Sequence, residues 1–575
     1  MLGNKAVARG LYEAGVCFVS SYPGTPSTEV TEEAALYDEI SCEWAPNEKV
    51  AMEAAFGASL AGRRSFCGMK HVGLNVAADP LYTMSYTGVN AGLVIVVADD
   101  AGMHSSQNEQ DSRHHAIASK VPMLEPSDSA EALAFTKLAF ELSERFDTPV
   151  IIKMCTRVAH SQSVVETGER TVPVKEYEKN IAKYVMMPAN AIRRHPIVEA
   201  RTAALREYAE TAPLNRVEMG GTALGIITSS TSYQYVREVM GDDVSVLKLG
   251  MVNPLPEKLI RDFAAKVDRL VVVEELDPII EEHVRRLGLE VSGKDILPLE
   301  GEFSQNLVAK ALGKDVPAGL SLGETVPVRP PVMCAGCPHR GLFYTLNRNK
   351  CTVLGDIGCY TLGAVAPLAA MEMTLCMGAS ISAVHGFNKA LGADNDKKAV
   401  AVIGDSTFMH SGMTGLANIA YNQSVSTVII LDNSITGMTG HQQNPTTGYN
   451  IKGDPAGKID LEALCRAMGF ARIRVVDPYD LSACDKVLKE ELAAPEPSVI
   501  ISRRPCALLK YVKHKAPLAV EPDKCIGCKS CMRIGCPAIS VRDGKARVDA
   551  TLCVGCGICS QLCPKDAFHS TGKEA

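Results

Sequence analysis

Residues 399–433 read AVAVIGDSTFMHSGMTGLANIAYNQSVSTVIILDN, a complete strand–helix–strand pattern. Residues 399–403 and 425–431 are short, apolar and rich in β-branched side chains, which predicts two strands buried on both faces of a parallel sheet. Between them, apolar residues at helical spacing predict one buried helix face. This face would consist of Met413, Leu416, Ala417, Ala420 and Tyr421.

Two polar residues follow the strands of this unit. Asp405 comes directly after the first strand, and Asn433 follows the second. Because a right-handed crossover makes the two strands parallel, both side chains should lie at the carboxyl edge of one sheet. A carboxylate and an amide oxygen at that edge predict a site for a hard cation such as Mg²⁺. The alternative is an ordinary βαβ unit in which the aspartate only caps the helix.

Gly404-Asp405-Ser406 followed by Asp432-Asn433 resembles the diphosphate-binding motif of thiamine diphosphate (ThDP) enzymes. Ser406 stands where that family usually has Gly, and Asp432 stands where it usually has Asn. The resemblance implies that the diphosphate lies against Gly404 and Ser406. It also implies a set of Mg²⁺ ligands, namely Asp405, the Asn433 side chain and the Ile435 carbonyl.

The composition argues against several classes of protein. With a net charge of −7, the chain shows no basic block for nucleic acid or a membrane surface. It has no long uncharged apolar run, and Met1 begins an amphipathic segment without the apolar core of a signal peptide. Its 20 cysteines indicate reduced thiols and metal sites instead of disulfides. We therefore predict a cytoplasmic protein of a strongly reducing or anaerobic cell that binds neither nucleic acid nor membrane.

Three residues near the N-terminus are site candidates. Asn47–Gly57 resembles the first-domain signature of ThDP enzymes, which implies that Glu48 hydrogen-bonds the aminopyrimidine ring of the cofactor. Tyr22–Ser27 resembles the YPxTPS turn of 2-oxoacid:ferredoxin oxidoreductases, which implies that Thr25 contacts the substrate. The alternatives are a solvated glutamate at a helix start and a threonine in a plain turn. Arg113 lies in a long polar loop after a strand, the kind of loop that often belongs to an active site, and is a candidate for holding a substrate carboxylate.

Four cysteines later in the chain form another candidate site. Cys334-x2-Cys337 alone is compatible with zinc, an iron–sulfur cluster or core thiols. Together with Cys359 and Cys506 it resembles the ligands of the cofactor-proximal cluster in pyruvate and 2-oxoglutarate members of the same superfamily, which implies an additional 4Fe–4S cluster. Gly378 can bring backbone close to the diphosphate. Residues 437–442 are either a phosphate-side or substrate-side loop or a surface turn.

The last fifty residues contain two cysteine runs that are typical of a two-cluster ferredoxin. The fourth cysteine of each run binds the other cluster in such domains. The predicted ligands are Cys525, Cys528, Cys531 and Cys563 for one 4Fe–4S cluster, and Cys553, Cys556, Cys559 and Cys536 for the other. The first run has four residues before its last cysteine where three are usual. Eight cysteines in this order leave little room for a zinc ribbon.

The fold class is α/β, with several doubly wound parallel-sheet domains of the ThDP-binding fold and a small C-terminal α+β two-cluster ferredoxin domain. The predicted parts are a pyrimidine-binding-type ThDP domain at 1–160, a linker region at 161–220, a small transketolase-C-terminal-like α/β domain at 221–314, a proline-rich linker at 315–333, a diphosphate-binding-type ThDP domain at 334–510, and the ferredoxin domain at 511–575.

This order of domains resembles the large subunits of the indolepyruvate branch of the 2-oxoacid:ferredoxin oxidoreductases. The resemblance implies oxidative decarboxylation of aryl 2-oxoacids to aryl-acetyl-CoA with ThDP, Mg²⁺ and clusters as cofactors, coenzyme A as co-substrate and ferredoxin as electron acceptor. It also implies a separate smaller β subunit that carries the superfamily's gamma domain, in an α2β2 assembly. The alternatives are a relative that acts on another 2-oxoacid, a non-redox ThDP lyase, and an electron-transfer subunit with a degenerate ThDP fold.

Overall fold

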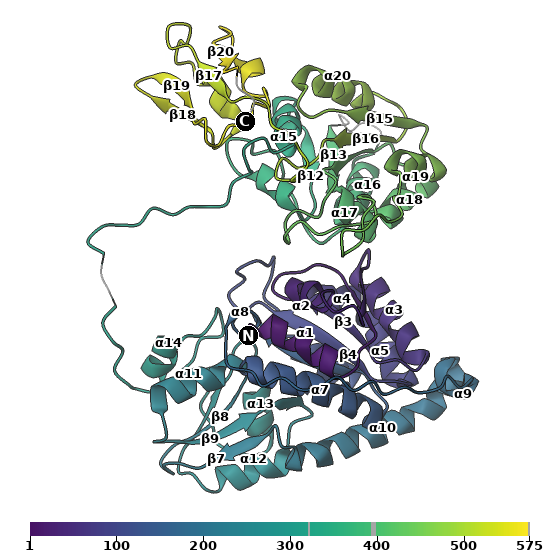
Figure 1. Ribbon diagram of the computed structural model, residues 1–575, viewed down its shortest axis with the longest axis vertical. Coiled ribbons are helices and arrows are strands. Elements are labelled where there is room, and N and C mark those ends of the chain that lie inside the picture. Colours follow the sequence, from purple (N-terminus) through teal and green to yellow (C-terminus); the bar gives the residue numbers. More distant parts are fainter. Residues whose placement is uncertain (320–321, 393–397, 573–575) are drawn as a thin grey trace. The chain divides into compact units, whose positions relative to one another are not determined.

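The computed structural model describes residues 1–319, 322–392 and 398–572. The chain forms two compact units, Met1–Gly323 and Glu324–Ala575, whose elements are labelled in Figure 1. The boundary between the units lies within residues 315–333, the segment predicted as a proline-rich linker, and the described residues there form no helix or strand. Within the described part of the chain, no helix is both long and apolar enough to cross a bilayer.

A seven-stranded sheet forms the centre of the first unit. Its strands, in spatial order, are β10 (Met251–Asn253), β5 (Met123–Leu124), β6 (Val150–Cys155), β4 (Leu93–Asp99), β3 (Ser65–Lys70), β1 (Phe18–Ser21) and β2 (Ser41–Trp44). All pairs are parallel except β10 with β5, which is antiparallel. The polar residues that follow the parallel strands therefore gather at one edge of the sheet.

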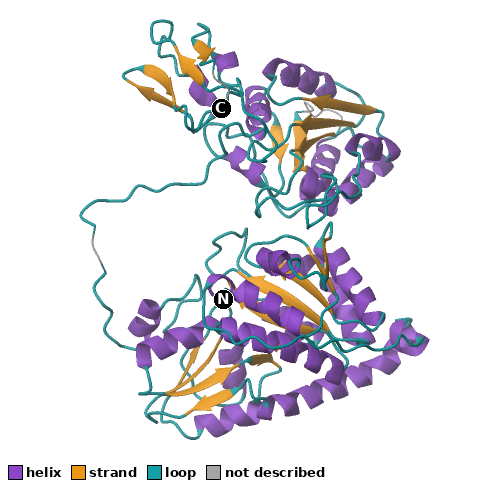
Figure 2. Ribbon diagram, in the orientation of Figure 1, coloured by secondary structure: helices purple, strands orange, loops and turns teal. Residues whose placement is uncertain are grey.

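Helices cover both faces of this sheet (Figure 2). Alternate residues of β4 point to opposite faces, so Val94 and Val96 pack in one core and Ile95 and Val97 in the other. The helices of the first face are α1 (Gly3–Glu13), α2 (Thr28–Ala34) and α7 (Ser129–Phe146). Those of the second are α3 (Glu48–Leu60), α5 (Ala78–Thr87) and α6 (Arg113–Ser119), with α4 (His71–Val76) after β3.

A smaller sheet shares the core of the second face. Its strand order is β11 (Leu270–Val273), β8 (Gly225–Ser229), β9 (Ser245–Leu249) and β7 (Arg216–Glu218). The helices around it are α11 (Ser230–Met240), α12 (Glu257–Ala264), α13 (Ile279–Arg286) and α14 (Gln305–Ala311). The predicted domain limits at 160, 220 and 314 do not separate independent bodies, because β10 belongs to the larger sheet and β7 to the smaller one.

Residues 161–220 are not the irregular linker that the sequence predicts. They contain α9 (Ile181–Tyr184) and the long helix α10 (Pro188–Thr211). The buried face of α10 includes Arg194 and Arg201, whose guanidinium groups donate to the backbone carbonyls of Tyr86 at 2.6 Å and Ser85 at 2.8 Å. A search for apolar residues at helical spacing misses such a helix, because arginine side chains occupy part of its buried face.

A five-stranded, wholly parallel sheet forms the second unit's larger domain. Its order is β12 (Thr352–Leu354), β13 (Ala399–Gly404), β14 (Thr427–Asp432), β16 (Ser498–Arg503) and β15 (Arg472–Val476). One face packs against α15 (His339–Arg348) and α20 (Leu481–Leu492), and the other against α16 (Ala379–Leu391), α18 (Met413–Asn422) and α19 (Leu461–Ala467). The predicted strand–helix–strand unit is thus confirmed as β13–α18–β14.

The buried face of α18 differs from the predicted stripe. The fully buried side chains are Leu416 and Ile419, whereas Tyr421 is 87% exposed. A π-helical turn at Phe408–Gly412 precedes α18 and adds residues to the turn. Of the predicted stripe, Leu416 is buried, Met413 and Ala420 are partly buried, and Ala417 and Tyr421 are exposed, so the prediction is only partly right.

The C-terminal domain consists of two short antiparallel pairs and two 3₁₀ turns. β17 (Leu518–Val520) pairs with β20 (Phe568–Ser570), and β18 (Ile539–Arg542) forms a hairpin with β19 (Lys545–Val548). The turns η3 (Ser530–Ile534) and η4 (Ser560–Leu562) occupy equivalent places in the two cysteine runs. This near-repetition agrees with the predicted α+β ferredoxin domain.

Candidate cofactor and cluster sites

Three oxygen-bearing groups converge at the carboxyl edge of the five-stranded sheet. The terminal amide atom of Asn433 lies 2.7 Å from the Ile435 carbonyl oxygen and 3.2 Å from Oδ1 of Asp405. With its oxygen turned toward them, the amide completes a cluster of three oxygens that only a cation can hold together. With its nitrogen turned toward them, the same amide satisfies both acceptors without a cation. The donor set fits Mg²⁺, which prefers oxygen ligands.

The Asp405 carboxylate is held in place by the segments on either side of the site. It accepts hydrogen bonds from the backbone N–H of Ser406 at 2.8 Å, the N–H of Ser434 at 3.1 Å and the Thr446 hydroxyl at 3.2 Å. Burial and, to a smaller extent, the nearby charge of Asp432 raise the pKa of Asp405 to about 8. A buried carboxyl that is costly to ionise without a positive charge beside it is well suited to a cation site.

The loop around Gly378 is shaped by a second buried carboxylate. Asp356 accepts hydrogen bonds from the N–H groups of Gly378 at 2.9 Å and Ser380 at 3.0 Å, at the start of α16. Gly378 has a φ of +91°, and a Cβ there would lie 2.6 Å from Cβ of Ser411. Only glycine fits this position, because its close neighbour is Ser411, and the approach of this backbone to the diphosphate stays a prediction. A Cβ on Gly404 would likewise meet the Tyr360 ring at 2.8 Å.

The predicted cysteines of the second unit line one cavity of about 130 Å³, here called the four-cysteine pocket. Its cysteines are Cys334, Cys337, Cys359 and Cys506. Asn433 and Gly437 also line it, so the pocket borders the oxygen cluster. Burial raises the pKa of Cys337 to about 12 and that of Cys359 to about 11, and the neighbouring thiols add to both shifts. A cluster bound here would have to displace these protons.

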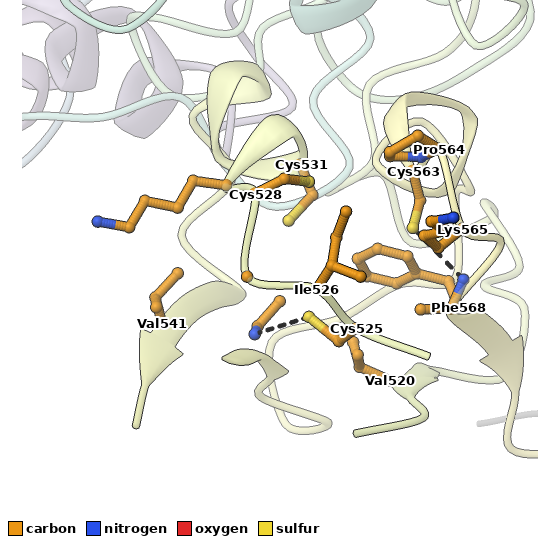
Figure 3. A pocket seen from close by; sticks show the side chains of 14 residues that line it. Val520, Cys525, Ile526, Cys528, Cys531, Val541, Cys563, Pro564, Lys565 and Phe568 are labelled. Carbon is orange, nitrogen blue, oxygen red and sulfur yellow. Dashed lines mark hydrogen bonds between the residues drawn. The ribbon is translucent and has the colours of Figure 1, made fainter. Parts of the chain in front are cut away.

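Figure 3 shows the pocket of the first ferredoxin set, defined as Cys525, Cys528, Cys531 and Cys563. Ile526 and Phe568 supply apolar wall. The N–H groups of Ala546 and Ala567 donate to the sulfurs of Cys525 at 3.4 Å and Cys563 at 3.3 Å. Such N–H donation lowers the pKa of Cys525 and favours the thiolate that iron requires.

The second ferredoxin set, Cys536, Cys553, Cys556 and Cys559, is also drawn together. Burial raises the pKa of Cys559, and the charges of Cys556, Cys536 and Cys553 raise it further, so these thiols are electrostatic neighbours. Among the described residues, no three or more His, Cys, Asp or Glu side chains are already arranged around the position of a single metal ion. The ligand assignment therefore rests on the cysteine motif and on the proximity of the thiols within each set.

Glu48 and Thr25 lie at the carboxyl edge of the seven-stranded sheet. Glu48 is the first residue of α3 after β2, and the Asn47 side chain caps this helix through the Val50 N–H at 2.9 Å. The Glu48 carboxylate is buried over Gly73, where a Cβ would lie only 2.6 Å from Oε1. Thr25 lies in the turn after β1 and precedes a cis proline.

Lys70 and His71 also belong to this edge, and no sequence pattern points to them, because β3 is a short strand without a clear apolar run. Lys70 ends β3 and lies beside Gly24, where an added Cβ would be 3.0 Å from Cβ of Lys70. Its ammonium group donates to the Ser105 carbonyl, and burial lowers the pKa of Lys70 while Asp100 opposes this shift. The Lys70 side chain therefore begins beside the Thr25 turn and ends at the Ser105 carbonyl.

The prediction that Arg113 contacts the substrate is wrong, because its side chain is buried and already paired. The side chain is 1% exposed and forms ion pairs with Asp111 at 2.6 Å and Glu274 at 2.5 Å. It also donates to the carbonyls of Glu275 and Asp277, near the end of β11. A guanidinium with these partners joins the two sheets of the unit and is not available to a carboxylate ligand.

Three family models match the chain. One described as pyruvate flavodoxin/ferredoxin oxidoreductase, thiamine diphosphate-binding, matches residues 9–215. One described as the C-terminal TPP-binding domain of thiamine pyrophosphate enzymes matches 356–502, and a 4Fe-4S binding domain matches 546–569. These matches confirm the predicted fold class and identify ThDP and 4Fe–4S clusters as cofactors of this chain.

Relatives extend the similarity to nearly the full length. The indolepyruvate oxidoreductase subunit IorA of Archaeoglobus fulgidus is 40% identical, over 99% of this chain and 97% of the relative. The IorA subunit of Pyrococcus horikoshii is 41% identical, over 99% of this chain and 96% of the relative. A solved structure, 2-oxoglutarate:ferredoxin oxidoreductase from Magnetococcus marinus with 2-oxoglutarate, coenzyme A and succinyl-CoA bound, is 20% identical with a TM-score of 0.46, over 54% of this chain and 64% of that one.

Proposed function

The chain belongs to the family of indolepyruvate oxidoreductase IorA subunits, and from this premise we propose that it catalyses oxidative decarboxylation of aryl 2-oxoacids to aryl-acetyl-CoA with electron transfer to ferredoxin. The observation that carries the proposal is the shared border of two sites in one domain. The oxygen cluster suited to Mg²⁺ and diphosphate adjoins the four-cysteine pocket suited to an iron–sulfur cluster. A non-redox lyase does not need an iron–sulfur cluster beside its cofactor.

Within the second unit, we assign the Mg²⁺ ligands to Asp405, Asn433 and the Ile435 carbonyl. Ser406 donates its N–H to Asp405 and accepts a hydrogen bond from Thr436, so it supports the ligand loop. The Gly378 turn is assigned to the diphosphate. When bound, ThDP supplies the electron sink that decarboxylation of a 2-oxoacid requires.

Within the first unit, we assign Glu48 to the aminopyrimidine ring of the cofactor and Thr25 to the substrate. The Glu48 carboxylate, fixed over Gly73, would hold or move a proton at a ring nitrogen. Lys70 replaces Arg113 as the residue proposed for the substrate carboxylate, because its Cβ borders Gly24 in the Thr25 turn and its ammonium has no carboxylate partner at ion-pair distance in the described structure.

The proposal includes three 4Fe–4S clusters, one on each ferredoxin set and one on the four-cysteine pocket. Cys359→Ser should lower the iron content of the purified chain from about twelve to about eight atoms. Cys465→Ser is the matched control, because Cys465 is buried in α19 and lines neither the four-cysteine pocket nor the first-set pocket. Equal iron in both variants would refute the third cluster.

A separate smaller subunit is part of the proposal, since the relatives are themselves named as subunits. We propose an α2β2 heterotetramer in which coenzyme A takes the acyl group. The decisive assay measures 2-oxoacid-dependent reduction of ferredoxin or a viologen dye, with and without the smaller subunit. We expect kcat/KM for indolepyruvate or phenylpyruvate to exceed that for pyruvate by at least about 100-fold, because a fitted apolar pocket distinguishes an aromatic ring from a methyl group.

The outcomes separate the alternatives. A preference for pyruvate or 2-oxoglutarate would replace the aryl assignment with another 2-oxoacid. Decarboxylation without an electron acceptor would favour a lyase, and full CoA-dependent turnover by the chain alone would remove the partner.

Glu48→Gln tests the cofactor role in the first unit. It should retain ThDP but lose roughly 10²–10⁴-fold in rate, which is the usual contribution of a general acid–base group. Glu53→Gln is the control, because Glu53 is an exposed residue of the same helix that pairs with Lys49. Wild-type turnover in Glu48→Gln would move the role to another residue.

A further inference from the structure

The ferredoxin domain packs firmly on the domain that carries the four-cysteine pocket. One hydrophobic core contains Leu342 and Phe343 of α15 together with Ile534, Ile558 and Cys559 of the ferredoxin domain. The two domains of the second unit therefore share a core instead of being joined only by a tether. Their cysteine sets are held at fixed positions relative to each other.

Arg340 spans this junction. Its buried guanidinium donates to the Cys334 carbonyl at 3.1 Å and to the Met333 carbonyl on one side. On the other side it donates to the carbonyls of Ile534 at 3.1 Å and Gly535 at 2.5 Å. The side chain thus ties the segment of the four-cysteine pocket to the residues just before Cys536 of the second ferredoxin set.

The extra residue of the first cysteine run lies at this contact. Ile534 and Gly535 stand between Cys531 and Cys536, where the usual spacing is one residue shorter. Gly535 adopts a φ of +66°, and a Cβ there would lie 2.9 Å from Cδ of Pro367. The longer loop turns its carbonyls toward Arg340, so the departure in spacing has a structural use.

A second contact supports the same junction. The Tyr479 hydroxyl donates to the Gly336 carbonyl, and a Cβ on Gly336 would lie 2.2 Å from the Val554 side chain. Gln561 donates to the Tyr479 carbonyl at 2.7 Å. Gly336 lies between Cys334 and Cys337, and Val554 lies between Cys553 and Cys556. The backbone between Cys334 and Cys337 therefore packs against the loop that carries Cys553 and Cys556 of the second ferredoxin set.

Electrostatics give the same neighbours. Burial lowers the pKa of Arg340, and the thiolate charges of Cys536, Cys337, Cys334 and Cys556 oppose this shift. Arg340 is thus a positive charge between the four-cysteine pocket and the second set.

We propose that Arg340 is a positioning residue that fixes the second ferredoxin set as the inner acceptor next to the four-cysteine pocket and makes its cluster easier to reduce. The inference rests on the proposed function, since it assumes clusters at these sets. With clusters bound, each electron would leave the pocket cluster, oxidising it by one, and would reduce the second-set cluster by one. The first-set cluster would receive the electron next and pass it to an external one-electron acceptor of the ferredoxin class.

The physical reason is that reduction adds negative charge to a cluster. A buried cation nearby stabilises the reduced state, and cluster potentials respond to such charges and to hydrogen bonds near the sulfurs. Arg340→Gln removes the charge and shortens the reach, whereas Arg340→Lys keeps the charge but cannot bridge both pairs of carbonyls. The matched control is Arg547→Gln, since Arg547 is an exposed arginine of the same domain paired with Asp543.

The experiment is an EPR-monitored reductive titration of the full chain with dithionite, without any 2-oxoacid. Arg340→Gln should make one cluster at least tenfold harder to reduce, so that its reduction potential falls by at least about 59 mV for one electron. The variant should also weaken the magnetic coupling of that cluster to the pocket cluster. Cys556→Ser identifies that cluster as the second-set one. Arg340→Lys should shift the potential less but weaken the coupling similarly, and Arg547→Gln should change neither.

Three results would overturn the proposal. The first is an unchanged potential and coupling in both Arg340 variants, and the second is a shift confined to the first-set cluster. The third is loss of both ferredoxin clusters in both variants, which would make Arg340 a requirement for the fold alone. Loss of only the second-set cluster would support the proposed placement. Because dithionite replaces the substrate, these results do not depend on whether the proposed decarboxylation is observed.

Discussion

Two Gly-Asp pairs follow adjacent parallel strands of the second unit, and the structure gives them different tasks. Asp356 follows β12 and Asp405 follows β13, and both carboxylates are buried. Asp356 accepts from the N–H groups of Ile357, Gly378 and Ser380, so its charge is used to fix the start of α16. Asp405 also accepts three hydrogen bonds, but its Oδ1 faces further oxygen-bearing groups.

The difference comes from the segment that crosses each site. The chain beside Asp356 presents backbone donors at a helix start, which complete the needs of a carboxylate. The chain beside Asp405 presents the Asn433 amide and the Ile435 carbonyl, which form a cluster of oxygens when the amide oxygen faces Asp405 and a hydrogen-bonded pair of acceptors when the amide nitrogen does. An identical dipeptide at an identical sheet edge is therefore structural in one case and a proposed ligand in the other.

The largest expected effect is on ThDP binding, which should depend on Asp405 and not on Asp356. Asp405→Ala should lose Mg²⁺-dependent ThDP binding, because one of few protein oxygens on the cation is removed. Calorimetric titration of ThDP in the presence of Mg²⁺ should show no binding at concentrations that saturate the wild-type chain. Stoichiometric ThDP and full activity in Asp405→Ala would break the comparison.

The next effect is on pH dependence. With a pKa of about 8 in the metal-free protein, Asp405 must release a proton when the cation binds. The apparent Mg²⁺ affinity should fall about tenfold for each pH unit below about 8 and level off above it. Proton release measured by calorimetry in buffers of different ionisation enthalpy checks this. An affinity independent of pH between 6 and 8 would contradict it.

The same pKa makes a statement about stability. Between the ordinary value of 3.8 and about 8, the folded metal-free chain keeps the proton that the unfolded chain has lost. The unfolded state then binds fewer protons, so this group's contribution to the free energy of unfolding decreases as pH rises through that window. Asp405→Asn should flatten this part of the pH profile, measured by denaturant unfolding with a chelator present. An unchanged profile would mean that another group titrates there.

The smallest effect concerns Asp356. Asp356→Asn loses the charge that three N–H groups share, and hydrogen bonds to charged groups contribute about 1.5–3 kcal/mol each. We expect the free energy of unfolding to fall by about that amount, measured by denaturant unfolding of the metal-free chain. In the matched variant, Asp405→Asn, the free energy of unfolding at pH 8 should fall less than in Asp356→Asn, or rise. A larger loss in Asp405→Asn would reverse the contrast.

Local pattern was a good guide wherever neighbours in sequence are also neighbours in space. Asp405 and Asn433 follow strands whose parallel pairing places them together, so the oxygen cluster follows from a short stretch. The first ferredoxin set lines one pocket because its motif closes over a few turns. Pattern failed where polar side chains replace the apolar signal, as in α10 with its buried arginines.

Arg113 and Lys70 show the remaining limit. The polar loop around Arg113 predicts a substrate contact, yet Glu274, which binds Arg113, is 161 residues away in the chain. The pattern around Lys70 predicts no site, because β3 is a short strand with Cys and Gly in its middle. In both cases the question is whether a charged side chain already has a partner. Partners far apart in the sequence meet only through the packing of one sheet against another.

The α/β architecture and the two ferredoxin cysteine runs can be read from the amino-acid sequence, because strand periodicity and close-range cysteine spacing act over a few residues. Three features became visible only in the folded chain: which of two Gly-Asp pairs faces oxygens, the pairing of Arg113, and the bridge that Arg340 makes between the four-cysteine pocket and the loop before Cys536 of the second ferredoxin set. These outcomes depend on contacts between segments that are distant in the chain, and a charged side chain acquires its role from the partner that burial places beside it.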